Sequence, residues 1–343
     1  MTTITAVVLN LNGRGLLERM LPTLLAQDVA PDERRLVVLD DGSTDGSPDW
    51  VRERFPEVEV VCNDGNRGVA RSFNRAVAIA EGSRYLALLN NDLELEPEYL
   101  SRLVALLDAE PDAGSAAGKM RSVRDPSRLD GAGDAFLWSS AATRRGFNEP
   151  DVGQYDAPAD VFSACGGAAV YRMAAFRDVG LFDGDFFAYL EDIDWGFRAQ
   201  LRGWRSLYLP DAVVHHIGGA TTSANARYFG MLQRRNQLLI VIKDYPGRAL
   251  VLHLPKVLLH HLGWLVASVR DEMVREHLRA LGQVVRMLPA TLYKRRVIQR
   301  RRRAGLERLD RVISPEPYHG DSLPERLRSM RTAVAPLFQR PRR

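Results

Sequence analysis

The sequence predicts an α/β fold in which a mostly parallel sheet is covered by helices on both faces, with amphipathic helices toward the C-terminal end. Short apolar runs alternate with segments of helical periodicity through the first 112 residues, which is typical of βα units. The runs are apolar throughout, as expected of strands buried on both faces. The chain of 343 residues, 45% hydrophobic and 26% charged, has room for one large domain with an appendage.

The expected elements follow one another at short intervals. Residues 5–10 form the first strand, Asn12-Gly13 a turn and residues 16–25 a helix. Further strands are expected at 36–39, 58–62 and 85–89, with helices at 47–55 and 68–81 between them. In such sheets a ligand lies beyond the carboxyl ends of the strands.

The second part of the chain has a weaker pattern. Residues 114–158 are rich in glycine, aspartate, serine and arginine, so we expect loops and short strands there. A strand is expected at 208–216 and a helix at 225–242, and residues 250–269 and 274–288 carry helical apolar stripes. Lys256 and three histidines interrupt the stripe at 250–269, so we expect an interfacial helix and no membrane-spanning one.

The distribution of charge and the spacing of the cysteines indicate which kinds of protein and site this sequence is able to form. Residues 1–240 hold 25 basic and 34 acidic residues, a net charge of −9, whereas residues 241–343 hold 22 and 9, a net charge of +13. The two cysteines, Cys62 and Cys165, lie far apart without metal-ligand spacing, so neither a disulfide framework nor a thiolate zinc site is expected. The first residues predict a strand and not a signal peptide, and we expect a cytoplasmic location.

Acidic and amide side chains collect where the four expected strands end, at Asn10-Leu11-Asn12, Asp40-Asp41, Asn63-Asp64 and Asn90-Asn91-Asp92. Oxygen donors two residues apart at a strand end lie on the same side and are able to hold Mg²⁺ or Mn²⁺, with water and a diphosphate as the remaining ligands. A solvated acidic loop is the alternative interpretation.

Residues 186–195 place Glu191, Asp192 and Asp194 among aromatic side chains. Partial desolvation there raises the pKa of a carboxyl group toward the range useful to a general base. The alternative is a helix N-terminus at which acidic residues favour the dipole. His215-His216 end the last expected strand, and a histidine there is able to complete a divalent site with Asp92, although a structural role is the alternative.

Eight segments in order resemble the inverting glycosyltransferases of family 2, in particular the rhamnosyltransferase-like branch. They are VVLNLNG (7–13), LDDGSTDGS (39–47), NDGNRGVARSFN (63–74), LLNNDLEL (88–95), CGGAAVYR (165–172), VGLFDGDFFAYLEDIDWGFRAQLRGW (179–204), VVHHIGGAT (213–221) and RRNQLLIVIK (234–243). The resemblance implies a GT-A fold with a Rossmann-like sheet over residues 1–243. Residues 1–112 would bind the nucleotide and residues 113–243 the acceptor.

The resemblance also implies roles at the donor side. Asp40 and Asp41 match the aspartate motif that contacts the base and ribose, and Asn12 lies beside that pocket. Asp92 matches the last residue of the metal-binding DxD motif, whose first position is Asn90 here, and Asn91 lies between them at the nucleotide. His216, in preference to His215, would be the further metal ligand. Arg67 lies near the nucleotide, although its loop lacks the glycine spacing of phosphate-binding loops, and a plain helix start is the alternative.

At the acceptor side, the resemblance assigns the general base to Asp192 and the small-residue turn near the acceptor to Gly166-Gly167. Glu191 is expected beside the acceptor, and Trp195 is a candidate wall of its pocket. The implied reaction is metal-dependent inverting transfer from a nucleotide diphosphate sugar, with dTDP-rhamnose favoured, to a saccharide acceptor in bacterial cell-envelope polysaccharide synthesis. A sugar-phosphate nucleotidyltransferase and a non-catalytic nucleotide-sugar-binding scaffold at the membrane are the alternatives.

The region 244–343 is helical and basic, with seven cations in the ten residues 294–303. Three kinds of partner are possible for this region. They are an anionic membrane surface, a protein surface (the catalytic domain or a second copy in a homo-oligomer), and nucleic acid. The neighbouring apolar stripe favours the membrane, because an apolar face plus a polybasic patch gives stable peripheral attachment. No nucleic-acid module is present in the sequence. We therefore expect attachment to the inner face of the cell membrane and a polyprenyl-linked acceptor.

Overall fold

The computed structural model describes residues 3–218 and 226–314, and it contains two compact units. The first comprises Met1–Ala135 and Thr143–Ser223, and the second Phe136–Ala142 and Ala224–Arg343. Two sequence predictions extend past this range: the end of the motif at 213–221 and the last part of the basic region, residues 315–343, lie outside the described residues.

The first unit carries the sheet. Its elements in chain order are β1 (Ile4–Asn10), α1 (Arg14–Leu25), β2 (Arg34–Asp40), α2 (Ser47–Arg54), β3 (Glu59–Cys62), α3 (Val69–Ile79), β4 (Tyr85–Asn90), β5 (Leu93–Leu95), α4 (Tyr99–Ala109), β6 (Ala113–Ser122), β7 (Leu129–Gly131), β8 (Asp134–Leu137), β9 (Ala142–Arg144), β10 (Ala159–Val161), β11 (Ala168–Arg172), α5 (Met173–Val179), the 3₁₀ turn η1 (Gly184–Phe186), α6 (Glu191–Arg202) and β12 (Arg205–His216). The chain enters the second unit within β8, at Phe136, and returns to the first unit within β9, at Thr143.

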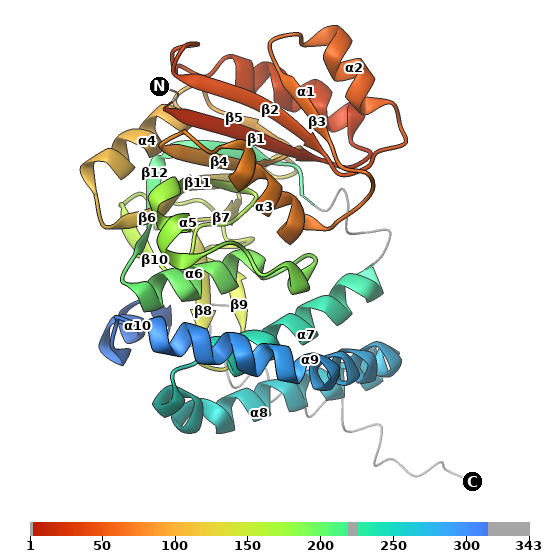
Figure 1. Cartoon of the computed structure of the whole chain (residues 1–343), viewed down its shortest axis with the longest axis vertical. Helices are drawn as coiled ribbons and strands as arrows, with labels where there is room; N and C mark the ends of the chain where they lie inside the picture. The colour runs from red at the N-terminus through yellow and green to blue at the C-terminus, as the bar shows by residue number, and fades with distance from the viewer. Residues whose placement is uncertain (1–2, 219–225, 315–343) are drawn as a thin grey trace. The chain divides into compact units, whose positions relative to one another are not determined.

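The sheet has the strand order β10-β12-β6-β11-β4-β1-β2-β3, with β5 added beside β12 and β7 beside β6. Strands β4, β1, β2 and β3 run parallel, and β11 joins them antiparallel between β4 and β6 (Figure 1). The predicted α/β architecture is confirmed, and the parallel part is the half that the sequence predicts as βα units.

Both faces of the parallel strands are covered. On β1, Ile4, Ala6 and Val8 face a core formed with α1 and α4, and Val7 between them is also buried. Helix α3 contacts β1 and β4 on the other face. Because side chains alternate across a strand, burial of successive residues requires helices on both sides, which explains the unbroken apolar runs.

Strand β6 is a ten-residue strand that the sequence analysis places among loops and short strands. Its sequence, AGSAAGKMRS, has almost no large apolar residue, so it lacks the usual strand pattern. Small residues are needed because neighbouring chain approaches closely: a Cβ on Gly118 would lie 1.9 Å from the carbonyl oxygen of Ala212. Close packing against neighbouring chain, and not the β-propensity of its residues, therefore accounts for this strand.

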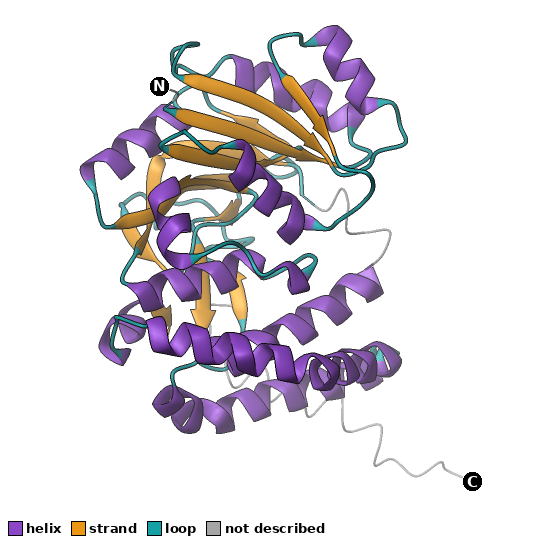
Figure 2. Ribbon diagram, in the orientation of Figure 1, coloured by secondary structure: helices purple, strands orange, loops and turns teal. Residues whose placement is uncertain are grey.

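The second unit consists of α7 (Ala226–Asp244), α8 (Gly247–Arg270), α9 (Val274–Arg301), α10 (Leu306–Val312) and the short β13 (Ile313–Ser314), which pairs with β8 (Figure 2). Helices α7 and α9 pack together, and Arg295 Nη1 of α9 donates 2.7 Å hydrogen bonds to the carbonyl oxygens of Ile242 and Tyr245. Trp138, in the segment that joins β8 to β9, stacks on His253 with ring centroids 4.4 Å apart.

Two findings about this unit differ from the sequence predictions. Helix α7 belongs to the helical unit because it packs on α9, so the compact units divide near residue 223 and not at 243. Helix α8 is also long and apolar enough, by length and composition, to cross a membrane: its best 18-residue window has a mean hydropathy of 1.4 and is 11% buried. Lys256 and the three histidines therefore interrupt the apolar character of this helix less than expected.

Candidate active site

The carboxyl ends of the parallel strands meet at one edge, as the sequence predicts. Asn10 at the end of β1 is in register with Asp40 at the end of β2, and Asp40 with Cys62 at the end of β3. Leu9 pairs with Asn90 of β4. The polar residues that follow these strands therefore gather beside one another.

Asn10 is the centre of a buried hydrogen-bond network at this edge. Its Nδ2 donates to Asp40 Oδ2 at 2.8 Å and to Ser47 Oγ at 2.8 Å, and its Oδ1 accepts from Asn91 Nδ2 at 2.8 Å. Gly13 makes room for Asn91, since a Cβ there would lie 2.0 Å from Asn91 Nδ2. Asn10 thus joins three loops, and Asn91, predicted to contact the nucleotide, lies buried in this network.

Asp40 shapes the turn after β2. Its Oδ1 accepts from the backbone N–H groups of Gly42 at 3.1 Å and Ser43 at 2.8 Å, and Ser43 Oγ donates to its Oδ2 at 2.6 Å. With the bond from Asn10, the four acceptor positions of the carboxylate are filled within the chain. These hydrogen bonds give Asp40 a role in shaping the loop, and its predicted contact with the nucleotide stays a prediction.

Asp41 holds the start of α3. Its Oδ1 accepts from Asn63 Nδ2 at 2.7 Å, and its two oxygens accept from the backbone N–H groups of Arg67 at 3.1 Å and Gly68 at 3.2 Å. The carboxylate therefore binds the orphan amides at the helix N-terminus, where an anion is favoured. The Arg67 side chain pairs with Asp64 at 2.8 Å and is half exposed. Nucleotide contacts by Asp41 and Arg67 stay predictions.

Asn12 links the first loop to the second. Its Oδ1 accepts from the Thr44 backbone N–H at 2.8 Å, and its own N–H donates to Ser43 Oγ at 2.7 Å. Asn12 adopts a left-handed conformation with φ of 50°, which asparagine tolerates better than most residues. The loop carrying Ser43 and Thr44 is thereby held at the strand edge, where we expect the nucleotide.

Asn90 and Asp92 present polar atoms that the described part of the chain leaves unused. The Asn90 side chain makes no hydrogen bond among the described residues, and Gly167 gives it room, since a Cβ there would lie 2.4 Å from Asn90 Nδ2. Asp92 Oδ1 is buried without a hydrogen-bond partner in the same range. A buried carboxylate oxygen without a partner is costly, which is the usual condition of a ligand-binding group.

His216 lies beside Asp92. Its Nε2 is 3.2 Å from Asp92 Oδ2 and its Nδ1 is 2.6 Å from Asp130 Oδ2. Burial alone would lower the pKa of His216, but the hydrogen bonds with Asp130 and Asp92 raise it to about 9. His215 points elsewhere, with Nε2 3.3 Å from Glu96 Oε1. The structure thus brings His216, and not His215, to Asp92.

These residues fit a divalent cation that also needs ligands from its substrate. Among the described residues no group of three or more His, Cys, Asp or Glu side chains is arranged to hold a metal on its own. Asp92 Oδ1 and one imidazole nitrogen of His216 are the available donors. Mg²⁺ and Mn²⁺ are commonly bound by one or two protein ligands plus phosphates and water, so this donor set suits them.

Asp192 occupies the first turn of α6. Its Oδ2 accepts from the Gly166 backbone N–H at 2.9 Å and its Oδ1 from the Ile193 backbone N–H at 2.8 Å. Burial raises the pKa of Asp192, and these backbone hydrogen bonds oppose the rise. Gly166 is needed for this approach, since a Cβ there would lie 3.0 Å from the Cβ of Asp192. The arrangement suits a general base.

Glu191, next to Asp192, is buried, and its Oε2 has no hydrogen-bond partner among the described residues. Burial, together with the charge of Asp192, raises the pKa of Glu191 well above its usual value. Both effects favour the neutral form of the carboxyl group, which is able to donate a hydrogen bond. Its predicted place beside the acceptor stays a prediction, as do those of Gly166 and Gly167.

Trp195 lies in an aromatic core. It is 1% exposed, its ring centroid lies 4.9 Å from that of Phe176 and 5.1 Å from that of Tyr171, and its Nε1 donates to the Gly180 carbonyl at 2.9 Å. These contacts anchor α6 to the aromatic core, and the predicted place of Trp195 at the acceptor pocket stays a prediction.

Sequence reasoning missed Asp130, Asp134 and Arg144. Asp134 is buried, accepts from Ser163 Oγ at 2.8 Å, and has its pKa raised well above the usual value by burial and by the charge of Asp192. Arg144 pairs with Asp130 and lowers the pKa of Asp192. The signal in the sequence is LDGAGD (129–134), two carboxylates in a glycine-rich segment of the region predicted as loops and short strands.

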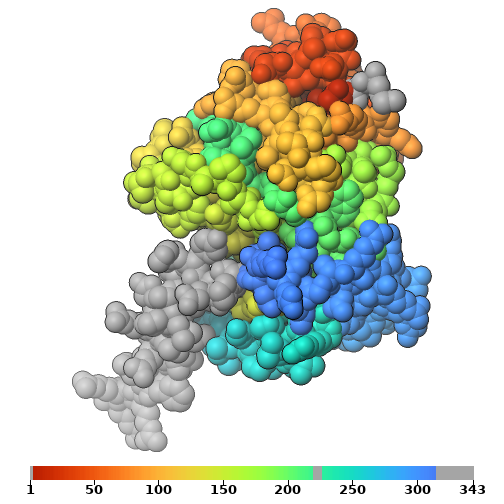
Figure 3. All heavy atoms as spheres, turned by 90° about the vertical axis from the view of Figure 1, so that its left-hand side faces the viewer, coloured from red at the N-terminus to blue at the C-terminus, as the bar shows by residue number. Residues whose placement is uncertain are grey.

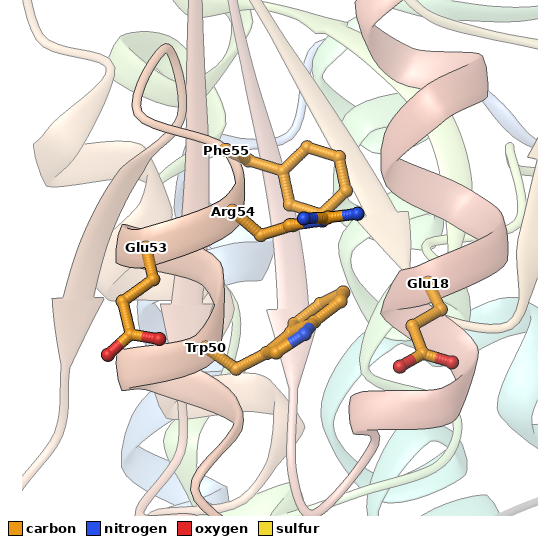
Figure 4. A pocket seen from close by; sticks show the side chains of 5 residues that line it. All are labelled: Glu18, Trp50, Glu53, Arg54 and Phe55. Atoms are coloured by element: carbon orange, nitrogen blue, oxygen red, sulfur yellow. The ribbon is translucent and has the colours of Figure 1, made fainter.

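A separate hollow of about 610 Å³ lies between α1 and α2 and is lined by Glu18, Trp50, Glu53, Arg54 and Phe55 (Figure 4). The sticks show the Arg54 guanidinium beside the Phe55 ring and the two carboxylates at the sides. None of the predicted site residues lines it.

Comparison with known proteins gives a family match. The sequence model of glycosyl transferase family 2 matches residues 5–180. The chain is 28% identical over 228 residues to the N-acetylglucosaminyl-diphospho-decaprenol L-rhamnosyltransferase of Mycobacterium tuberculosis, covering 60% of this chain and 73% of that protein. It is 26% identical over 164 residues to the glucosyl-dolichyl phosphate glucuronosyltransferase of Haloferax volcanii, covering 47% of this chain and 49% of that protein.

Solved structures share the fold. The S. aureus TarS fragment 1–349 in complex with UDP-GlcNAc superposes with a TM-score of 0.58 at 17% identity, covering 87% of this chain and 91% of that one. The Pyrobaculum calidifontis mannosyltransferase PcManGT, in complex with GDP-Man and Mn²⁺, gives a TM-score of 0.51 at 20% identity, covering 98% of this chain and 81% of that one. These likenesses establish the GT-A fold that the sequence predicts.

Proposed function

Because this chain belongs to glycosyl transferase family 2 and is an inverting glycosyltransferase, we propose that it uses Mg²⁺ or Mn²⁺ to transfer a sugar from a nucleotide diphosphate to a saccharide acceptor. Rhamnose from dTDP-rhamnose is the favoured donor sugar, and a polyprenyl-linked saccharide is the favoured acceptor. The family membership removes the main reason to consider a nucleotidyltransferase or a non-catalytic scaffold.

One observation carries the proposal: two carboxylates with different surroundings lie in the same unit. Asp92 has an oxygen without a partner among the described residues and lies 3.2 Å from His216. Asp192 is desolvated and has a raised pKa. The unpartnered oxygen and the neighbouring imidazole suit Asp92 to a metal ligand, whereas the desolvated carboxylate of Asp192 suits a proton acceptor.

Asp92 and His216 would hold the cation, which when bound supplies positive charge against the negative charge that grows on the leaving diphosphate. Asp192 accepts the proton of the acceptor hydroxyl as that oxygen attacks the anomeric carbon. The Gly166 N–H, 2.9 Å from Asp192 Oδ2, keeps that carboxylate oriented. A single displacement with one base inverts the anomeric centre.

The choice of donor and acceptor rests on the relative from M. tuberculosis. Its name specifies an L-rhamnosyl group and a diphospho-decaprenol-linked acceptor, and it shares 28% identity with this chain over 228 residues. PcManGT was crystallised with Mn²⁺, which supports a divalent cation in this fold. We infer by this similarity a role in bacterial cell-envelope polysaccharide synthesis.

A lipid-linked acceptor requires access to a membrane, and the second unit offers a surface for it. Helix α8 exposes Val251, Leu252, Leu258, Leu259 and Leu262, each more than half exposed. The teal spheres of Figure 3, which include α8, lie at the surface of that view. The C-terminal part of α9 adds the exposed cations Arg296, Arg300 and Arg301. An apolar helix face together with a basic patch favours attachment to an anionic membrane. We propose that the chain lies on the inner face of the cell membrane.

The test is transfer by the purified full chain. The protein is incubated with Mn²⁺, a panel of nucleotide sugars including dTDP-rhamnose, and a short-chain polyprenyl diphosphate N-acetylglucosamine, and the product is identified by mass spectrometry. Asp192→Asn should lose transfer by about a hundredfold or more while it retains donor binding. Asp211→Asn, whose side chain is 74% exposed, is the matched control. Equal turnover by Asp192→Asn would show that the base is another group.

A further inference from the structure

Asp130 contacts the edge of the His216 ring that is turned away from Asp92. Asp130 Oδ2 lies 2.6 Å from His216 Nδ1, while His216 Nε2 lies 3.2 Å from Asp92 Oδ2. The Asp130 and His216 side chains are each 13% exposed. The imidazole ring therefore lies between two carboxylates, with one ring nitrogen directed to each.

The sheet register produces this arrangement. On one side of β12, His216 pairs with Leu93 of β5, the residue after Asp92. On the other side, His216 pairs with Ser122 of β6, which is in turn bordered by β7. Asp130 is the central residue of β7, so the carboxylates reach the ring from two directions across neighbouring strands.

Asp130 is itself fixed. Arg144 donates to Asp130 Oδ2, and the Arg144 guanidinium also lies over the Phe147 ring at 4.7 Å. Gly131 lets Arg144 approach, since a Cβ there would lie 3.2 Å from the Cβ of Arg144. A carboxylate held by an arginine in this way has little freedom to leave the imidazole.

We propose that Asp130 is a positioning residue that fixes the ring of His216, with Nδ1 directed to Asp130 and Nε2 directed to the side of Asp92, where a divalent cation would bind. This inference rests on the proposed function of Asp92 and His216 as metal ligands. Partners of this kind orient metal-binding histidines in proteins, and their loss typically weakens metal binding by about 10- to 100-fold.

The experiment is a double-mutant cycle on Mn²⁺ affinity. Binding of Mn²⁺ to the full chain is measured by electron paramagnetic resonance in the presence of dTDP, UDP or GDP, for the wild type, Asp130→Ala, His216→Ala and the double variant. Asp130→Ala should weaken binding about tenfold or more, and it should cause no further loss in the His216→Ala background. Asp130→Asn, whose amide oxygen still accepts from Nδ1, should restore part of the affinity.

Asp178→Ala is the matched control, because Asp178 is also a poorly exposed carboxylate paired with an arginine, Arg202. It should leave Mn²⁺ affinity unchanged. If the wild type binds Mn²⁺ and Asp130→Ala binds it equally well, the positioning role alone is overturned. The same holds if Asp130→Ala lowers the affinity as much in the His216→Ala background as in the wild type. A wild type that binds no Mn²⁺ with any of the three nucleotides overturns the metal site and the inference together.

Discussion

The backbone N–H of Gly166 donates a 2.9 Å hydrogen bond to Asp192 Oδ2, and the missing side chain of Gly166 makes that approach possible. A Cβ at this position would lie 3.0 Å from the Cβ of Asp192 and 3.2 Å from Cε2 of Phe73. Phe73 is nearly fully buried, so it has little freedom to move aside. An added methyl group should therefore displace the carboxylate.

Gly166→Ala should lower kcat by about tenfold or more, because the base loses its orientation while the donor site at Asp92 is untouched. The donor KM should change little, and steady-state kinetics separates the two. Gly15→Ala is the control, since Gly15 lies in α1 and a Cβ there has no atom within 4 Å. A rise in donor KM without a fall in kcat would place Gly166 in donor binding instead.

The pH dependence of transfer should report the raised pKa of Asp192. The base acts as a carboxylate, so kcat/KM should fall as pH falls through that pKa and level off above it. Because burial raises the pKa, the acid limb should lie at higher pH than the ordinary value of about 3.9 for aspartate. A profile at saturating Mn²⁺, with donor binding measured separately over the same range, checks this. An acid limb at the ordinary value would contradict a desolvated base.

Asn10→Ala should destabilise the protein and weaken donor binding together. It removes the donor to Asp40 and Ser47 and the acceptor for Asn91. Buried groups left without partners cost about 1–3 kcal/mol each, so the free energy of unfolding should fall by about 2 kcal/mol or more in urea titrations. Thr5→Ala, which loses a buried 2.8 Å bond to Ser83 away from the loops, is the control. It should lower stability but spare donor affinity, and equal donor affinity in both variants would contradict the role given to Asn10.

The parallel strands and the gathering of polar residues at their ends follow from the sequence, because a buried strand leaves an apolar run and parallel strands end at a common edge. The two strand ends also predict that a histidine of the pair 215–216 lies beside Asp92, and the structure places His216 there. The sequence does not reveal whether the oxygens of a carboxylate already accept hydrogen bonds from the protein itself. Asp40 is a residue type that commonly binds ligands, yet its carboxylate accepts four hydrogen bonds from neighbouring residues.

The surroundings of Asp130 and Trp195 could not be predicted from the sequence. Asp130 reaches His216 only through the register of β7, β6 and β12, which residue patterns do not encode. Trp195 is one of several aromatic residues near the predicted base, and only packing shows that its ring lies in the core. Burial and register are tertiary properties, so predictions that depend on them needed coordinates.

The proposed membrane contact can be tested in the full chain by flotation with liposomes. Leu258 and Leu262 on α8 are 61% and 54% exposed, and Leu258→Gln with Leu262→Gln should reduce binding, because less apolar area enters the bilayer. Arg296→Gln with Arg300→Gln should reduce binding to anionic vesicles only, by about 1 kcal/mol for each charge, and added salt should reproduce that loss.

The matched control is Val152→Gln with Leu181→Gln, two exposed apolar residues of the first unit, 80% and 51% exposed. It should float like the wild type, since a general loss of surface apolarity does not remove a specific face. Equal flotation of the α8 double variant would contradict attachment through α8 and favour a second copy of the chain as the partner of that face. Because α8 is long enough to cross a bilayer, extraction at high pH decides the mode: a peripheral protein is released, whereas retention would contradict the surface-bound arrangement.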